Sequence, residues 1–354
     1  MTDNNIRYFL GSNTKRGFVP LFDELRDPIE GQRLYIIKGG PGSGKSSLMR
    51  RVAKVLEDRQ HTMEYIHCAS DPDSLDAFID YKSGIAMVDG TAPHIMDPRY
   101  PGAYDVIINM AECWDDTVLL ENKKEIMAIS DTISNCHHIA TSSISSAAAL
   151  LDNNMHIAKP YVHYDAINDF VTKLIKKLKD SKTGKEKQRL LSAVSVGETV
   201  FFGETIEKLS NTIHVIPDMW GAASAILLSR LYHSATLLGL EQIVCYCSIR
   251  TPDKIDHIIF PSAGISVTTA NSFHSIKDNK HHILEDLMKS IDKTEQEMMS
   301  LHLNKAKELI DIASEHIKSA KLHHDDLEAF YVKAMDFSKV DIIYDRIMNE
   351  ISLS

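Results

Sequence analysis

The first third of the chain alternates short apolar runs with one stretch of helical periodicity. Residues 34–37 (LYII) form an apolar run of strand-forming residue types, and a glycine-rich segment follows it at 39–44. Apolar residues then recur at helical spacing, at Leu48, Val52, Val55 and Leu56. Two further apolar runs typical of strands lie at residues 62–68 and 84–90. This pattern predicts an α/β fold with a mostly parallel sheet flanked by helices.

Two other stretches are predicted to be helical. Residues 71–76 (DPDSLD) carry proline and acidic residues, which is typical of a turn followed by the start of a helix. From about Asp97 to Leu178 helical spacing dominates, and Val106 and Met110 fit the same spacing. We expect this region to form a helical hairpin or small bundle appended to the sheet.

The second half of the chain repeats the pattern of the first. Residues 213–216 (IHVI) stand where residues 34–37 stood, at an offset of 179 residues. The same offset matches Gly42 with Gly221 and Leu48 with Leu227. After one extra residue the matches continue with Pro72 and Pro252, Gly84 and Gly264, and His94 and His274. A run of matches in order predicts a tandem duplication.

The duplication predicts the domain organisation. Residues 1–180 would form the first copy, with a helical appendage at about 97–180. Residues 181–188 would be a basic linker, and residues 189–354 the second copy, with a helical appendage at about 276–354.

Composition and charge narrow the function classes. The chain of 354 residues is 44% apolar, which suffices for ordinary buried cores. Its net charge of -10 makes binding to nucleic acid unexpected. The five cysteines lack paired metal-ligand spacing and indicate reduced thiols. The first residues are polar and no apolar run reaches membrane-spanning length, so we expect a cytoplasmic protein without membrane contact.

The glycine-rich segment fits the phosphate-binding pattern G-x-x-x-x-G-K-[ST], between a predicted strand and a predicted helix. Its glycines let backbone N–H groups approach phosphate oxygens, and the helix N-terminus adds a positive dipole end. We predict that the nucleotide is bound by Gly39, Gly40, Pro41, Gly42, Ser43, Gly44, Lys45, Ser46 and Ser47. Lys45 would contact the β- and γ-phosphates of ATP.

Metal binding and catalysis need carboxylates near this loop. Asp89 closes the apolar run 84–90, which is typical of an aspartate that holds Mg²⁺ together with the hydroxyl of Ser46. Asp71 ends the neighbouring predicted strand and is the alternative carboxylate, either for the metal or for the attacking water. We therefore name Lys45, Asp89 and Asp71 as catalytic candidates.

The second copy lacks these groups. Ser224 stands at the position of Lys45, Ala225 at that of Ser46 and Thr269 at that of Asp89. Asp218 would add a negative charge where phosphates would lie. The second half is therefore predicted not to hydrolyse nucleotide.

The chain resembles a group of bacterial tandem P-loop proteins that are mostly described as ATPases. The resemblance covers nearly the whole chain and is carried by residues 7–10, 17–19, 38–46, 67–76 and 88–94. It implies a P-loop NTPase fold, ATP and Mg²⁺. Members can carry a phosphate loop in both halves, and this sequence departs from that in its second half.

Three functions stay open at this point. The leading hypothesis is a Mg²⁺-dependent ATPase with one active half and a pseudo-enzyme half. The alternatives are a P-loop kinase of a small molecule or nucleotide, and a nucleotide sensor that does not hydrolyse ATP. A protein partner or a homo-oligomer is compatible with each.

Overall fold

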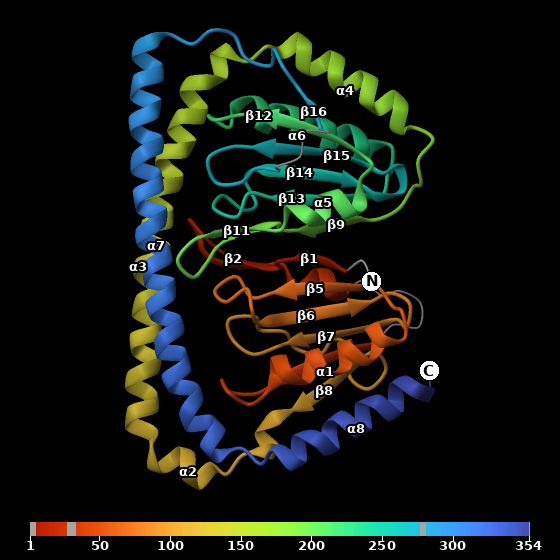
Figure 1. Ribbon diagram of the computed structural model, residues 1–354, viewed down its shortest axis with the longest axis vertical. Coiled ribbons are helices and arrows are strands. Elements are labelled where there is room, and N and C mark those ends of the chain that lie inside the picture. Colours follow the sequence, from red (N-terminus) through yellow and green to blue (C-terminus); the bar gives the residue numbers. More distant parts are fainter. Residues whose placement is uncertain (1–4, 27–32, 277–280, 354) are drawn as a thin grey trace. The chain divides into compact units, whose positions relative to one another are not determined.

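The computed structural model describes residues 5–26, 33–276 and 281–353, so the polar segment 1–4 lies outside the described part (Figure 1). The chain divides into two compact units. Unit 1 comprises Met1–Gly11, Pro20–Ile139 and Glu315–Ser354, and unit 2 comprises Ser12–Val19 and Ala140–Ser314. The fold is mixed α/β, with one six-stranded, mostly parallel sheet in each unit.

The sheet of unit 1 has the strand order β1-β5-β6-β7-β4-β8. Its strands are β1 (Ile6–Tyr8), β4 (Arg33–Lys38), β5 (Met63–His67), β6 (Leu75–Asp80), β7 (Ile85–Asp89) and β8 (Asp105–Asn109). All run parallel except β6, which is antiparallel to both of its neighbours. The expected strands at 34–37, 62–68 and 84–90 are thus confirmed as β4, β5 and β7.

One face of this sheet is covered by α1 (Lys45–Asp58) and α8 (Phe337–Leu353) (Figure 1). Leu48, Val52 and Leu56 of α1 are fully buried, or nearly so, as the helical spacing predicted. They share a core with Val340 and Ile347 of α8. Burying one face of each helix against a sheet is the main source of its stability.

The sheet of unit 2 has the order β16-β12-β15-β14-β13-β9. Its strands are β9 (Glu186–Arg189), β12 (Thr212–Pro217), β13 (Gln242–Tyr246), β14 (Ile255–Phe260), β15 (Ile265–Ala270) and β16 (His282–Ile283). Here β14 is the one antiparallel strand. Read from β9, this sheet has the same order and the same strand directions as the sheet of unit 1 read from β1. The helices α4 (Tyr164–Leu178) and α6 (Ala222–Leu237) pack together in its core.

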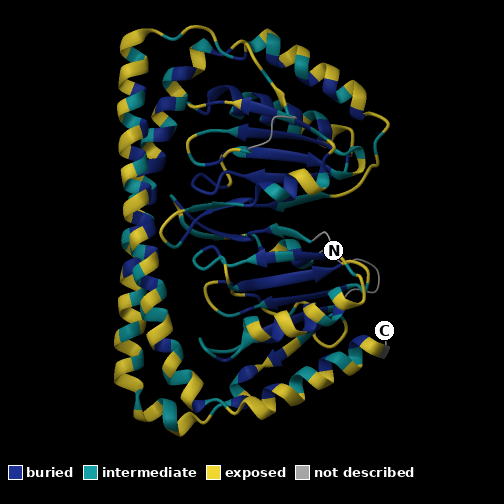
Figure 2. Ribbon diagram, viewed as in Figure 1, coloured by how far each residue is buried: buried dark blue, intermediate teal, exposed yellow. Residues whose placement is uncertain are grey.

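The remaining elements are short, apart from two long helices. They are β2 (Gly11–Thr14), β3 (Gly17–Pro20), β10 (Ser192–Val194), β11 (Thr199–Phe201), α2 (Asp116–Glu121), α5 (Gly203–Leu209), η1 (Phe22–Arg26), η2 (Met110–Cys113), η3 (Lys159–Tyr161) and η4 (Pro261–Ala263). The long helices are α3 (Lys123–Ala158) and α7 (Lys293–Ala334). Figure 2 shows buried strands in both sheets, and buried and exposed positions alternating along α3 and α7. No helix of the described residues has both the length and the apolarity needed to cross a membrane.

Two local predictions were wrong. Residues 71–76 were expected to start a helix, but Leu75–Asp80 is strand β6, all of whose residues are buried. Pairing with β5 and β7 on its two sides outweighs the local helix-start signal. Residues near Val106 were expected to be helical, but Asp105–Asn109 is the edge strand β8, in which Val106 and Ile108 follow the two-residue strand period.

The compact units also differ from the expected split near residues 181–188. Helix α4, expected in the first copy, packs on α6 in unit 2. Helix α8, expected in the second copy, packs on α1 in unit 1. Strand β9 begins at Glu186, inside the expected linker. Complementary apolar faces decide these pairings, and such faces can lie far apart in the sequence.

Candidate functional site

The glycine-rich loop connects the end of β4 at Lys38 to the start of α1 at Lys45. Gly42 and Gly44 have φ angles of 66° and 85°, in the left-handed region that glycine adopts without strain. Gly44 is the residue that precedes α1, and the amide of Leu48 already donates to its carbonyl. The predicted strand, turn and helix are therefore all present, and the loop precedes a helix N-terminus with unpaired N–H groups.

Lys45 and Asp89 meet beside this loop. The ammonium of Lys45 donates to the carbonyls of Gly39 and Gly40, at 3.0 and 2.7 Å. Its Nζ lies 3.6 Å from Oδ2 of Asp89, and only 12% and 17% of the two side chains are exposed. Asp89 ends β7, which is paired with β4, so the sheet itself places the carboxylate next to the loop.

The serines of the loop have different surroundings. Ser43 is buried and its hydroxyl donates to the carbonyl of Gly40 at 2.8 Å. Ser46 Oγ accepts a hydrogen bond from the amide of Leu75 at 3.1 Å, which ties α1 to the start of β6. Ser47 is exposed. Ser46 is thus held close to the loop, while Ser47 faces solvent.

Asp71 lies in the turn between β5 and β6 and is brought to a different partner. Its Oδ2 is 3.5 Å from the ammonium of Lys321 in α7. Within the described residues, no ion pair or hydrogen bond joins Asp71 to Lys45 or to Asp89. The two candidate carboxylates therefore have separate partners in unit 1.

The last turns of α7 lie directly on the loop. A Cβ added to Gly40 would be 2.5 Å from the ring of Tyr331, and one added to Gly42 would be 2.8 Å from the carbonyl oxygen of Glu328. The amide of Gly42 also donates to the side chain of Glu328, at 3.2 Å. A carboxylate oxygen of α7 therefore accepts the kind of hydrogen bond that a phosphate oxygen would accept. The sequence pattern gave no signal for this contact.

The corresponding loop of unit 2 carries its own carboxylate. Gly221, with a φ of 80°, precedes α6 as Gly44 precedes α1. Asp218 is buried and accepts hydrogen bonds from the amides of Gly221 and Ser224, at 2.8 and 2.6 Å. Its carboxylate thus accepts hydrogen bonds from two N–H groups at the start of α6, where a negative charge is favourable.

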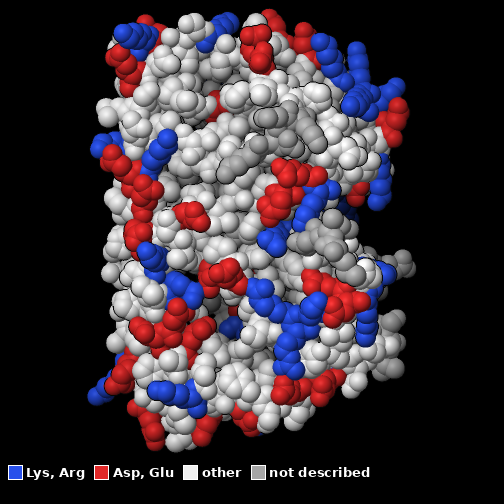
Figure 3. Space-filling model, viewed as in Figure 1, with Lys and Arg blue, Asp and Glu red and all other residues white. Residues whose placement is uncertain are grey.

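A basic cavity of about 900 Å³ lies on α1 and β5, beyond the loop. Its cationic lining consists of Arg7, Arg50, Arg51 and Lys54. Figure 3 shows lysine and arginine side chains gathered over the region of α1. Leu75 belongs to this lining, and its amide is the donor to Ser46, so the cavity borders the glycine-rich loop.

One buried acid was not assigned a role from the sequence. Asp76 in β6 is 4% exposed, and burial raises the pKa of its carboxyl to about 6. Within this net pKa, His94, 3.2 Å from Asp76, has a lowering effect and Asp89 a raising one. Asp76 and His94 each have the same residue type 180 positions later, at Asp256 and His274, and this recurrence is the sequence signal that could have identified Asp76.

Comparison of the chain with protein-family models, with curated proteins and with solved structures finds no match.

Proposed function

We propose that unit 1 binds ATP with Mg²⁺ at the glycine-rich loop and hydrolyses it. The supporting observation is that a strand, a glycine loop and a helix converge on a lysine and a strand-end aspartate, with 3.6 Å between Lys45 Nζ and Asp89 Oδ2. Each part has a task in binding a polyphosphate. The loop amides and the helix N-terminus attract anions, and the lysine adds a full positive charge.

The residues take the following roles in this proposal. Lys45 exchanges its contacts with the carbonyls of Gly39 and Gly40 for the β- and γ-phosphates. Ser46 and Asp89 hold Mg²⁺, which when bound neutralises phosphate charge. Asp71, half-buried beside Lys321, is the candidate for orienting the attacking water. These groups stabilise charge that develops as the terminal phosphoryl group leaves.

Nucleotide binding also requires a change at α7. Glu328 and Tyr331 lie where the phosphates would approach Gly42 and Gly40. In the proposed cycle the triphosphate displaces the carboxylate of Glu328 from the Gly42 amide, and the end of α7 moves off the loop. Glu328 thus competes with ATP for the same donor.

Unit 2 is proposed to be an inactive copy of the same ancestral module. Both sheets have the same strand order, and both loops place a left-handed glycine before a helix. The lysine and the strand-end carboxylate are replaced by Ser224 and Thr269, and Asp218 occupies the anion position. A triphosphate would be repelled there by a buried negative charge.

A second candidate function is phosphoryl transfer to an anionic acceptor. The basic cavity favours it, because the cavity borders the loop and is lined by four cationic side chains. An acceptor carrying a phosphate or carboxylate group would be attracted by Arg50, Arg51 and Lys54. Under this alternative, Lys54→Ala should slow transfer of labelled phosphate to added acceptors while leaving hydrolysis unchanged.

The deciding experiment measures ATP binding and turnover with the full chain. Wild type is compared with Lys45→Ala and Ser46→Ala, with Asp58→Asn as the control, because Asp58 is an exposed residue at the far end of the same helix α1. We expect turnover to fall by at least about a hundredfold in the first two variants and to stay unchanged in the control. Binding by wild type without turnover would favour a sensor, and an absence of binding would refute the proposal.

A further inference from the structure

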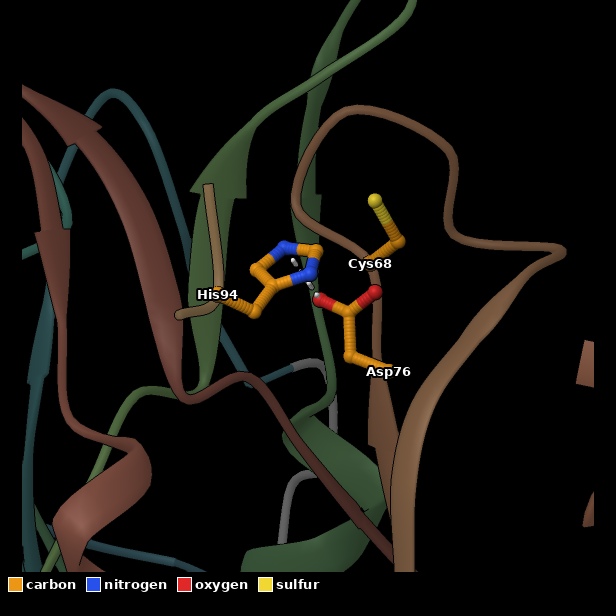
Figure 4. Close-up of side chains that lie close together, drawn as sticks. All are labelled: Cys68, Asp76 and His94. Atoms are coloured by element: carbon orange, nitrogen blue, oxygen red, sulfur yellow. Dashed lines mark ion pairs between the residues drawn. The ribbon is translucent and has the colours of Figure 1, made fainter. Parts of the chain in front are cut away.

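Three side chains from separate segments of unit 1 lie close together (Figure 4). Cys68 follows β5, Asp76 lies in β6, and His94 lies in the turn after β7. Their potential ligand atoms all lie within 4.8 Å of one another. Figure 4 shows the imidazole and the thiol both close to the carboxylate of Asp76.

The carboxylate of Asp76 is unusual because it is buried with an imidazole as its nearest basic group and with neither a lysine nor an arginine of the described residues paired to it. Asp76 is 4% exposed, and His94, which is 8% exposed, lies against the ring of Phe22. Oδ2 of Asp76 accepts no hydrogen bond, although Nε2 of His94 is 3.2 Å away. No lysine or arginine of the described residues forms an ion pair with Asp76. A buried negative charge in such a place needs a cation.

Unit 2 contains the same three residue types with a different charge balance. Cys247, Asp256 and His274 occupy the corresponding positions, since Cys68 N donates to Ser74 O as Cys247 N donates to Lys254 O. Lys254 forms a buried ion pair with Asp256, and Arg250 lies against Cys247 and Asp256.

These two cations are missing from the equivalent positions of unit 1. Ser74 stands where Lys254 stands in unit 2, and Ser70 and Asp71 lie at the position of Arg250. The protein therefore supplies its own positive charge to this cluster in unit 2 but not in unit 1.

We propose that Cys68, Asp76 and His94 bind one divalent transition-metal ion, with Zn²⁺ as the expected metal. A thiolate, an imidazole and a carboxylate together suit Zn²⁺, whereas Mg²⁺ and Ca²⁺ prefer oxygen ligands alone. Donor atoms around a tetrahedral zinc ion lie about 3.5 Å apart, so small side-chain rotations close the site. The thiol of Cys68 releases its proton to solvent on binding, and the thiolate and carboxylate then balance the charge of the ion.

Three protein ligands leave a fourth position of the ion for water or another ligand. This site is distinct from the proposed Mg²⁺ position, which uses Ser46 and Asp89. It connects the ends of β5, β6 and β7, the strands that lead into the turns beside the glycine-rich loop. The metal would therefore fix these turns in place, independently of whether ATP is bound.

The test uses the full chain without a histidine tag, stripped of metal with a chelator and reloaded with Zn²⁺ or Co²⁺. We expect about one equivalent of Zn²⁺ after removal of the excess, and a thiolate-to-metal charge-transfer band with Co²⁺. Cys68→Ser should abolish this band and weaken Zn²⁺ binding by about a hundredfold or more. Cys247→Ser is the matched control and should keep both properties.

A second variant tests the charge argument directly. Ser74→Lys places an ammonium where unit 2 has Lys254, and it should abolish metal binding while the circular dichroism spectrum stays unchanged. The proposal is overturned if the charge-transfer band survives Cys68→Ser, or if wild type retains no more Zn²⁺ than Ser74→Lys. In that case Asp76 and His94 form only an internal pair. None of these measurements depends on ATP hydrolysis.

Discussion

Oε1 of Glu328 accepts a hydrogen bond from the amide of Gly42 across a distance of 3.2 Å. These residues are far apart in the sequence, and α7 brings them together in unit 1. Gly42 belongs to the loop proposed to hold a triphosphate, so a protein carboxylate and a phosphate oxygen would use the same donor. This relationship makes the end of α7 a regulator of access to the loop under the proposed function.

Removing the charge of Glu328 is expected to favour nucleotide binding. Glu328→Gln keeps a hydrogen-bond acceptor but eliminates the negative charge that would face the phosphates. Because the side chain is 41% exposed, the gain should be modest, about fivefold in ATP affinity. Titration calorimetry measures it, with Asp326→Asn, an exposed change on the same helix, as the control. Equal affinities for all three proteins would contradict the competition.

The contact between Gly40 and Tyr331 can be tested without nucleotide. A Cβ at residue 40 would lie 2.5 Å from the tyrosine ring, so Gly40→Ala should lower the free energy of unfolding by about 1–3 kcal/mol. Removing the ring as well, in Gly40→Ala with Tyr331→Ala, should cost less than the sum of the single changes. Denaturant unfolding of the four proteins gives the coupling. Strict additivity would mean that α7 does not press on the loop.

The internal carboxylate of unit 2 is expected to stabilise the start of α6. Asp218→Ala leaves the amides of Gly221 and Ser224 without their acceptor, which should lower stability by about 1–3 kcal/mol. Met219→Ala, a neighbouring change at an exposed side chain, should have little effect. The thermal midpoints of the two variants are the measurement. If they fell equally, the carboxylate would not be the stabilising group.

His214 in β12 is expected to make unit 2 sensitive to acid. Burial, together with the nearby His282 and Lys177, lowers the pKa of this imidazole from 6.5 to about 4, and the ring of Phe170 packs against it in a T-shaped arrangement. Between pH 6.5 and 4 the unfolded chain binds a proton that the folded state does not, so stability falls as the pH falls. This pKa shift corresponds to a change of at most about 3 kcal/mol in the free energy of unfolding. Because the imidazole is partly exposed, we expect about 1–2 kcal/mol.

Substitution isolates this contribution. His214→Phe removes the titrating group and keeps a ring against Phe170, so its stability should vary less between pH 7 and pH 4.5 than that of wild type. Denaturant unfolding at several pH values measures the slope. Parallel curves for the two proteins would show that His214 titrates alike in both states.

The sequence by itself determined the local elements around the loop. The apolar run at 34–37, the glycines and the spacing of Leu48, Val52 and Leu56 predicted a strand, a turn and a helix, and the structure has them. It also indicated that Asp89 closes a strand, and the pairing of β7 with β4 then places it beside Lys45. Such features are visible because side-chain periodicity and glycine conformation act over a few residues.

Only the tertiary structure decided which distant segments meet. It made Leu75–Asp80 a central strand against the local helix signal, and it assigned α4 to unit 2 and α8 to unit 1. It also set Glu328 against Gly42 and gathered Cys68, Asp76 and His94. These arrangements depend on apolar faces and buried charges whose complements lie outside the local sequence, up to 286 residues away for Gly42 and Glu328. No local sequence pattern encodes such pairings. The residues around an apolar face are the same in the sequence whichever surface that face packs against.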